Sequence, residues 1–286
     1  MSPPLVTLTS DFGMSDGYVA TMKGVILSIC PDARLIDISH EVPPQNINHA
    51  AFVLGTTYRH FPGSAVHLAV VDPGVGSARH PILLVTPHGA FVGPDNGLFS
   101  FVLSANGATL SEQLRPEAQV LDSVHVNVPD GCQAFLLNRA EYWMEPVSDT
   151  FHGRDIFAPA AGHLAAGIPA QDLGSPLSRL RSSYFPPIIA NADRMDGHVI
   201  HVDRFGNLVT DLVLQEPVDR TMQVEIRGQR INGISRGYQS ASGLLAIKGS
   251  HGFLEIAYRN DSASKLISAY VGAQVTVRSV DSARWH

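Results

Sequence analysis

Carboxylates stand at or near the ends of three predicted strands, which is where an open α/β sheet binds its ligands. Asp11 directly follows the predicted strand 5–10, and Asp72 follows the apolar strand predicted over 65–71. Asp37 lies inside a short predicted strand and is interpreted as structural. Two interpretations of Asp11 remain open: a turn or helix-capping residue, or a carboxylate that accepts hydrogen bonds from two adjacent hydroxyls of a ligand.

The loop Asp72-Pro-Gly-Val-Gly-Ser-Ala-Arg79 combines a carboxylate, two glycines and a guanidinium. Glycine lets a backbone approach a ligand closely, although one Gly-x-Gly is also common where a strand leaves a sheet. We expect Asp72 and Arg79 to form an ion pair, which either supports the loop or orients a water molecule in a cleft. His152, in Phe151-His-Gly-Arg-Asp155, either starts a helix or faces that cleft.

A second candidate binding segment, Asp203-Arg-Phe-Gly-Asn207, lies in the C-terminal part of the chain. Its aromatic ring could stack on a purine while its amide contacts the base edge, but turns with Gly and Asn are also common in β proteins. None of the 13 histidines falls in a metal-binding spacing such as His-Glu-x-x-His, so no metal is expected. Cys30 and Cys132 lack Cys-x-x-Cys spacing and are expected to be reduced thiols.

An α/β domain over residues 1–175 is predicted to position the first group of residues. Its predicted strands are 5–10, 33–39 and 65–71 with a hairpin over 82–92, and its predicted helices are one that contains Tyr18, Met22 and Ile26, then 47–58, 96–103 and 155–166. Near-continuous apolar strands of this kind are typical of a parallel sheet that helices cover on both faces.

Residues 176–190 are rich in Ser, Arg and Pro and are predicted to be a linker. The pattern over residues 191–286 is then that of an all-β domain. Its predicted strands are 198–202, 208–214, 222–226, 244–248, 253–258 and 273–280, with one helix over 262–270. The Gly and Asn turns between these strands favour a small barrel or sandwich.

The composition narrows the class of protein. The 286 residues are 44% hydrophobic and 16% charged, which is a globular balance. A net charge of −6 without a basic tract argues against a nucleic-acid partner. No apolar run is long enough to cross a membrane, and the first residues lack the pattern of a signal peptide, so we expect a cytoplasmic location.

Six motifs occur in an order that is similar to a known family. They are Ser10-Asp-Phe-Gly13, Met22-Lys-Gly24, Val71-Asp-Pro-Gly-Val-Gly76 with Arg79, Pro94-Asp-Asn-Gly-Leu98, Asp203-Arg-Phe-Gly-Asn207 and Gly252-Phe-Leu-Glu-Ile-Ala257. The chain resembles the S-adenosylmethionine hydroxide adenosyltransferases, relatives of the fluorinases and chlorinases. The resemblance implies a Rossmann-like N-terminal domain, a C-terminal β-barrel, and a homotrimer whose active sites lie between the N-terminal domain of one subunit and the C-terminal domain of the next.

The resemblance also assigns roles to residues of the first domain. Asp72, Arg79 and His152 match the Asp-Arg-His set of the family around the attacking water. Asp11 matches the carboxylate that holds the ribose hydroxyls.

In the second domain the resemblance assigns four binding residues. Phe205 and Asn207 match the pair that contacts adenine, and Asp203 and Ser250 match groups around the methionine moiety. His251 stands where fluorinases place an arginine near the substrate carboxylate.

Three departures from the halogenating relatives bear on the nucleophile and the ribose. Asp72 and Arg79 replace the loop of those enzymes, and the short segment between Arg79 and Pro94 lacks the fluorinase insertion, which favours water over halide. Gln45 replaces an aromatic residue that covers the ribose in fluorinases.

The implied reaction is attack of water or hydroxide on the ribose C5′ of S-adenosyl-L-methionine, which yields adenosine and L-methionine without a cofactor. Two alternatives stay open at this point: chloride-dependent adenosyl transfer, and a protein that binds S-adenosylmethionine or adenosine without turnover.

Overall fold

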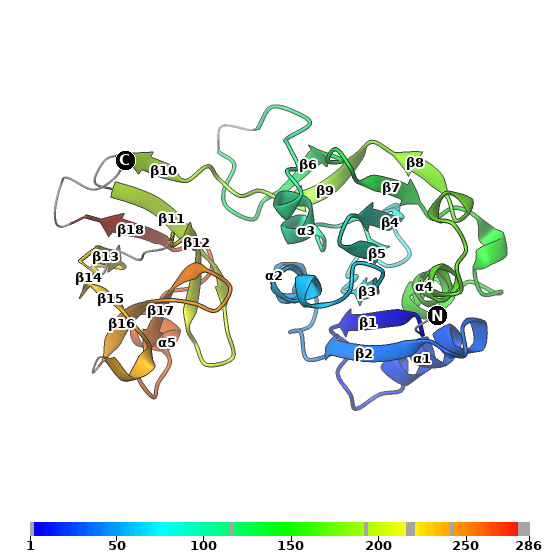
Figure 1. Ribbon diagram of the computed structural model, residues 1–286, viewed down its shortest axis with the longest axis horizontal. Helices are drawn as coiled ribbons and strands as arrows, with labels where there is room; N and C mark the ends of the chain where they lie inside the picture. Colours follow the sequence, from blue (N-terminus) through cyan, green and yellow to red (C-terminus); the bar gives the residue numbers. More distant parts are fainter. Residues whose placement is uncertain (1–2, 115–116, 192–193, 216–220, 241–242, 280–286) are drawn as a thin grey trace. The chain divides into compact units, whose positions relative to one another are not determined.

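The computed structural model describes residues 3–114, 117–191, 194–215, 221–240 and 243–279. The chain divides into two compact units (Figure 1). The first comprises Met1–Arg115 and Ser123–Ser183, and the second comprises Pro116–Asp122 and Tyr184–His286. Each unit is described by itself below.

The first unit is built on a seven-stranded sheet in the order β2-β1-β3-β5-β4-β7-β8. Its strands are β1 Leu5–Ser10, β2 Arg34–Ser39, β3 Val66–Val70, β4 Pro81–Thr86, β5 Gly89–Pro94, β7 Gln133–Leu136 and β8 Ser175–Leu177, and β6 Ser123–Asn127 and β9 Arg179–Ser183 form a separate ribbon. Its helices are α1 Tyr18–Ile29, α2 Ile47–Thr57, α3 Ser100–Ala105 and α4 Ala158–Ala165.

The strands β2, β1, β3 and β5 are parallel, and β4, β7 and β8 continue the sheet in antiparallel pairs. The chain goes from β1 outward to β2 and then returns to β3 on the other side of β1. This reversal makes the carboxyl ends of β1 and β3 the switch point at which such sheets bind ligands. The predicted α/β class is therefore confirmed.

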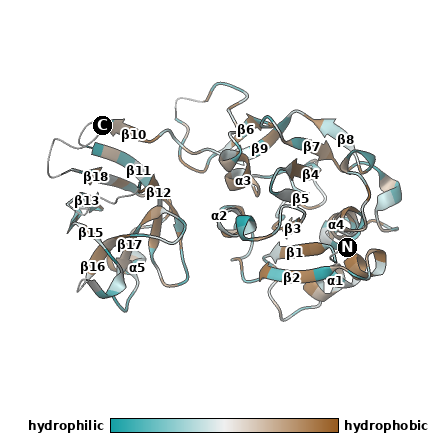
Figure 2. Ribbon diagram, viewed as in Figure 1, coloured by the Kyte–Doolittle hydropathy of each residue, from teal (hydrophilic) through white to brown (hydrophobic). Residues whose placement is uncertain are grey.

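Side chains of β1 and β3 alternate between two packed layers, as a strand requires. Val6 and Leu8 belong to a core cluster with Met22 of α1 and Phe157 next to α4. On β3, the buried His67 ring stacks on Phe91 at 4.8 Å between centroids. Hydrophobic residues accordingly run along β1 in Figure 2.

Two segments of the first unit differ from prediction. The predicted helix 96–103 begins only at Ser100, because the Asn96 side chain donates to the Val71 carbonyl at 2.9 Å and Gly97 turns the chain with a φ of 99°. Part of the predicted linker 176–190 is strand, because β9 pairs with β6. Its buried side chains Leu180 and Ser182 alternate with exposed arginines, and since only one of the two is apolar, the hydrophobic pattern did not reveal the strand.

The second unit is a nearly closed barrel with the strand order β14-β13-β18-β11-β12-β17-β16-β15, and β10 pairs with β11. Its strands are β10 Ile189–Asn191, β11 Arg194–Val202, β12 Leu208–Val213, β13 Gln223–Ile226, β14 Gln229–Asn232, β15 Ile234–Ser235, β16 Leu244–Lys248, β17 Phe253–Tyr258 and β18 Gln274–Arg278. Only Gly233 separates β14 from β15, so the two ends of the sheet adjoin. This decides between the barrel and the sandwich in favour of the barrel.

The predicted helix 262–270 is wrong in length, because α5 covers only Ala263–Leu266. The positive φ of Ser268, 49°, stops the helical turn, and the Ser264 hydroxyl donates to the Ala269 carbonyl. The end of the predicted strand 273–280 at residue 280 lies outside the described residues.

Two further predictions concern the cysteines and membrane-spanning helices. Both cysteines, Cys30 and Cys132, are free thiols. Among the residues that the structure describes, no helix combines the length and the apolar character that crossing a membrane requires.

Candidate active site

The predicted ion pair between Asp72 and Arg79 is present and shielded from water. The Arg79 Nε atom lies 2.9 Å and 3.0 Å from the two carboxylate oxygens of Asp72, and Nη2 contacts Oδ2 as well. The side chains are only 8% (Arg79) and 6% (Asp72) exposed. Removing one partner of such a pair leaves the other charge poorly solvated, so the pair depends on both residues.

His152 completes the group that was predicted for this loop. Its Nδ1 atom lies 2.8 Å from Arg79 Nη2. A guanidinium can only donate, so Nδ1 is the acceptor and the proton of the neutral ring sits on Nε2. Burial and the positive charge of Arg79 both lower the pKa of His152 below its ordinary value. The Arg79 guanidinium also stacks over the Phe157 ring at 5.1 Å.

A π-helical turn, Gly153–Phe157, holds His152 in place, and turns of this kind are frequent at functional sites. Asp155 in this turn is fully buried and accepts from the Ser148 hydroxyl at 2.6 Å and from Arg154 Nε at 2.5 Å. Burial alone would raise the pKa of the Asp155 carboxyl, but these hydrogen bonds outweigh burial and lower it. The carboxylate therefore ties the turn to the preceding loop.

Asp11 lies at the switch point beside this cluster. Ser10 is in register with Val70 of β3, so Asp11 and Asp72 leave neighbouring parallel strands close to one paired position. One carboxylate oxygen, Oδ2, accepts from the backbone N–H of Gln45 at 2.7 Å. Gln45 has a φ of 63°, a conformation that is unfavourable outside glycine. A carboxylate accepts at both oxygens, so Asp11 can bind a ligand hydroxyl as well.

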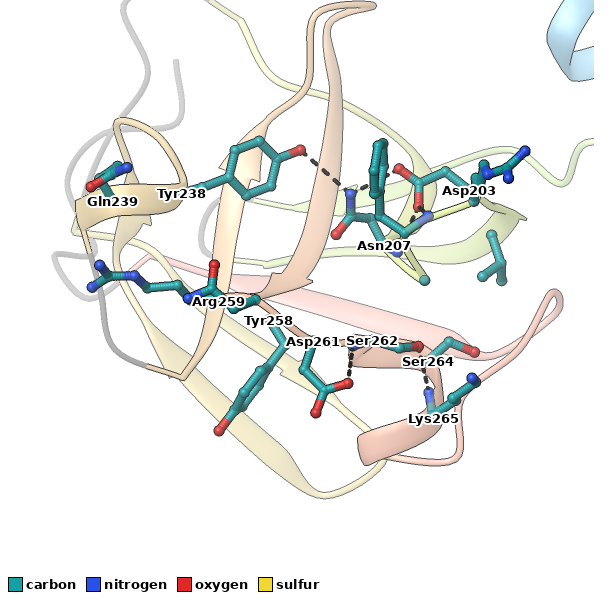
Figure 3. Close-up of a pocket in the computed structure, with 15 residues that line it drawn as sticks. Asp203, Asn207, Tyr238, Gln239, Tyr258, Arg259, Asp261, Ser262, Ser264 and Lys265 are labelled. Carbon is teal, nitrogen blue, oxygen red and sulfur yellow. Dashed lines mark hydrogen bonds between the residues drawn. The ribbon is translucent and has the colours of Figure 1, made fainter.

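In the second unit, Asp203 and Asn207 form one tightly bonded loop (Figure 3). Asp203 Oδ1 accepts from the backbone N–H of Phe205 and Asn207 at 2.9 Å and 2.8 Å, and Oδ2 accepts from the Asn207 side chain at 2.8 Å. The loop presents the Phe205 ring, which is 76% exposed. An exposed aromatic ring on a rigid loop is suited to stacking against a planar ligand.

A pocket of about 800 Å³ lies against this loop. Phe205, Asn207, Tyr238, Tyr258 and Lys265 are among its lining residues. The volume falls within the range of roughly 300–1,000 Å³ that is usual for small-molecule sites. Figure 3 shows the Tyr238 hydroxyl directed toward Asn207, at 3.5 Å from Nδ2.

Tyr238 also joins the loop to a buried acid. Its hydroxyl donates to Glu255 Oε2 at 3.3 Å, and His251 Nε2 lies 2.9 Å from Glu255 Oε1. Burial and the negative charge of Glu255 raise the pKa of Tyr238 to about 12, so its hydroxyl stays protonated and can donate. Ser250 is exposed on the adjoining turn and is not among the residues that line the pocket.

The structure thus brings the sequence-predicted residues together in two groups, Asp72–Arg79–His152 in the first unit and Asp203–Phe205–Asn207 in the second. Sequence reasoning did not find Phe157 or Tyr238, because each reaches its group from a distant segment without a local pattern. The Pro94-Asp-Asn-Gly-Leu98 motif was visible, but the contact between Asn96 and the end of β3 was not.

The first unit has a shielded acid–guanidinium–imidazole group at the switch point of its α/β sheet, and the second unit has a nucleoside-sized pocket. These features are typical of an enzyme that acts on a small molecule. Residues 6–174 match the family model of the SAM hydroxide adenosyltransferase N-terminal domain, and residues 197–276 match that of the C-terminal domain. The chain belongs to the S-adenosylmethionine (SAM) hydroxide adenosyltransferase family.

Individual relatives agree with this assignment. The chain is 36% identical to the (R)-S-adenosyl-L-methionine hydrolase of Salinispora tropica over 97% of this chain and 99% of that protein. It is 36% identical to the protein of the same name from Thermus thermophilus, over 94% and 98%. A fluorinase of Nocardia brasiliensis is 26% identical over 73% and 71%. The crystal structure of a conserved protein from Thermotoga maritima superposes with a TM-score of 0.79 at 32% identity, over 96% and 99%.

Proposed function

We propose that the protein hydrolyses S-adenosyl-L-methionine to adenosine and L-methionine. The observation that carries this proposal is the Asp72–Arg79–His152 group at the switch point, in a chain whose hydrolase relatives are more similar to it than the fluorinase is. The relatives are named for the R form of the substrate, so we propose the same configuration here.

The bond changes require little acid or base catalysis. An oxygen of water forms a bond to the ribose C5′ while the C5′–S bond breaks, and the electron pair of that bond leaves with the sulfur. The sulfonium becomes the neutral thioether of methionine, so the leaving group needs no proton, and the water loses one proton to solvent. Holding the water in line with the C–S bond is then the main task of the site, because positioning alone can supply a large part of the barrier reduction. The proposal therefore involves no metal or cofactor, and dialysis against EDTA should leave turnover unchanged.

The hydrogen-bonding capacity of the cluster assigns a role to each residue. Nε and Nη2 of Arg79 are occupied by Asp72 and His152, which leaves Nη1 to stabilise hydroxide character in the water. His152 presents Nε2–H as a donor to the water oxygen. Asp72 is the acceptor of the group and accepts a hydrogen bond from the water, whose proton passes to solvent.

Substrate binding is proposed to follow the family pattern. Asp11 accepts from the ribose hydroxyls with the oxygen that Gln45 does not occupy. Phe205 stacks on the adenine and Asn207 contacts its edge. Asp203 and Ser250 lie toward the methionine moiety, and Asp203 in addition holds the loop that carries Phe205.

A product assay tests the proposal. The pure protein, incubated separately with each sulfonium epimer and with or without chloride, should release adenosine and methionine in equal amounts from the R form. An Asp72→Ala variant should lose turnover by about 10² or more and still bind adenosine. Release of 5′-chloro-5′-deoxyadenosine would support the chloride-dependent alternative, and binding without turnover would support the non-catalytic one.

The proposal also covers the oligomeric state of the protein and its location in the cell. We propose a homotrimer in the cytoplasm, with each site formed by the N-terminal domain of one subunit and the C-terminal domain of the next. Light scattering of the pure protein should give three times the mass of the chain. A protein that stays monomeric at working concentration would refute shared sites.

A further inference from the structure

A series of connected polar side chains begins at Ser10, the residue before Asp11, and does not belong to the Asp72–Arg79–His152 group. The Ser10 hydroxyl and His40 Nδ1 are 2.7 Å apart, and both side chains are buried. His40 Nε2 lies 3.1 Å from Asp37 Oδ1, and Lys23 Nζ donates to Asp37 Oδ2 at 2.7 Å. Burial alone would raise the pKa of the Asp37 carboxyl, but Lys23 and His40 outweigh it and lower the pKa.

His40 contacts residues on both sides of Asp11. Its backbone carbonyl accepts from the Gly13 N–H at 2.8 Å, and its ring reaches Ser10. Ser10 Oγ in turn accepts from the Phe12 N–H at 3.4 Å. The three residues around Asp11 are therefore fixed to one histidine, directly or through Ser10.

The order serine, histidine, aspartate does not make this series a nucleophilic triad. Ser10 has no exposed surface, so its hydroxyl cannot reach a substrate. The Asp37 carboxylate near His40 Nε2 can only accept, so the proton of a neutral His40 ring lies on Nε2. His40 Nδ1 is then the acceptor, and the Ser10 hydroxyl donates to it. These contacts fix the ring orientation and not a reactive atom.

We propose that His40, with Ser10 and Asp37, is a positioning residue that orients Asp11 toward the ribose hydroxyls. The inference rests on the ribose role that is proposed above for Asp11. Asp11 has one oxygen on the Gln45 N–H and one for the ligand, so a small rotation of the backbone at residue 11 moves the second oxygen away from a hydroxyl. The loss of His40 or Ser10 should thus reduce recognition of the sugar hydroxyls and leave recognition of the base unchanged.

The experiment compares adenosine with 2′-deoxyadenosine by calorimetry on the full-length protein. The ratio of the two dissociation constants measures hydroxyl recognition, and a general loss of packing would weaken both ligands alike. The wild type should prefer adenosine by about tenfold or more, as expected for one charge-assisted hydrogen bond. Asp11→Ala should abolish this preference. Ser10→Ala and His40→Phe should each reduce it by about threefold or more.

The same sheet offers a matched control. Thr7 lies on β1 three positions before Ser10, and its hydroxyl is 2.7 Å from Nδ1 of the buried His67. Thr7→Val removes a buried hydroxyl–imidazole contact of the same length from the same strand. Because His67 does not adjoin the Asp11 loop in sequence and packs on Phe91, the preference for adenosine should remain that of the wild type.

The outcomes separate the two proposals. If Asp11→Ala abolishes the preference while Ser10→Ala and His40→Phe keep it, the positioning role is wrong and the ribose role of Asp11 stands. A preference that survives in Asp11→Ala overturns the ribose role and the positioning role with it. An equal loss in Thr7→Val and Ser10→Ala would show general destabilisation and would also refute positioning. Should His40→Phe fail to fold, Ser10→Ala decides alone, because it removes only one oxygen atom.

Discussion

At the scale of residues, the chemistry of the site is dictated by which atoms can donate and which can accept. Arg79 only donates and the Asp72 carboxylate only accepts, so the contact between Arg79 and His152 is favourable only while Nδ1 carries no proton. Protonating the ring would place two donors against each other at 2.8 Å. The neutral imidazole is therefore the form that maintains the cluster.

This requirement predicts the pH dependence of turnover. Since burial and Arg79 lower the pKa of His152 below 6.5, the active neutral form persists at neutral pH and is lost only as the pH falls through that lowered pKa. A profile of kcat/KM should therefore be flat at neutral pH and should have its acidic limb below pH 6.5.

His152→Asn is the matched variant for this prediction. Its side-chain oxygen can still accept from Arg79, but the Nε2–H donor is lost. We expect turnover to fall by about 10² and the acidic limb to move or vanish. An unchanged limb in the variant would assign it to another group.

How far the sequence predicts the site depends on whether the partners are close along the chain. Asp72 and Arg79 are seven residues apart, and their opposite charges indicated the pair that the structure contains. The contact of Gln45 with Asp11 spans 34 residues and uses a backbone N–H, which no residue type reveals. Local charge and loop chemistry are readable from sequence, whereas long-range backbone contacts are not.

At the scale of elements, the loop that presents Phe205 depends on one close approach. Gly206 has a φ of 83°, and a methyl group there would overlap the Ser262 side chain at the start of α5. The two elements are joined in addition by the Ser264 N–H, which donates to the Gly206 carbonyl at 2.9 Å. Both the conformation and the space require glycine.

Gly206→Ala should therefore destabilise the loop more than the backbone conformation alone explains. Gly228→Ala is the matched control, because Gly228 has a φ of 75° in the same unit and no atom within 4 Å of the added methyl group. We expect the control to cost about 1–2 kcal/mol of unfolding free energy and Gly206→Ala to cost more. Urea denaturation measures both. Adenosine affinity should fall only for Gly206→Ala, and an equal effect of the two variants would contradict the close approach.

The ends of a strand or helix could be predicted where the hydrophobic pattern followed a single periodicity. The strands predicted over 5–10 and 65–71 match β1 and β3 almost to the residue. The helix predicted over 262–270 stops after Leu266, because the left-handed Ser268 is not visible in a hydrophobic pattern. Polar strands such as β9, with the sequence Arg-Leu-Arg-Ser-Ser, lack the apolar alternation that marks a strand.

At the scale of the whole molecule, one core histidine is expected to set part of the acid stability. His67 has no exposed surface, and burial lowers its pKa to about 4 from the ordinary 6.5. Between these two values the unfolded chain binds a proton and the folded chain does not, so stability falls as the pH drops from 6.5 to 4. The total loss is about 3 kcal/mol.

His67→Phe tests this linkage, because a phenyl ring can keep the stacking on Phe91 without titrating. The slope of unfolding free energy against pH between 4 and 6.5, taken for the first unit, should be shallower in the variant by about 1.4 kcal/mol per pH unit. Equal slopes in the two proteins would contradict a neutral His67 in the folded state.

Shared sites in the proposed trimer predict complementation between two inactive chains. Asp72→Ala damages the first domain, and Phe205→Ala removes an exposed ring from the second and leaves its core intact. Random trimers from equal co-expression should recover about a quarter of the wild-type turnover, because a quarter of the sites combine two undamaged domains. Each variant alone should stay nearly inactive. A mixture no more active than its components would place each site within one chain.

The adjoining ends of the barrel sheet have a consequence for solubility and association. A free edge strand exposes a row of backbone N–H and C=O groups that can recruit a strand from another molecule. Here the described path ends in β14 and the two-residue β15, with Gly233 alone between them, so those terminal strands offer little backbone for such recruitment. A strand from another molecule would therefore find few backbone groups to pair with at that seam.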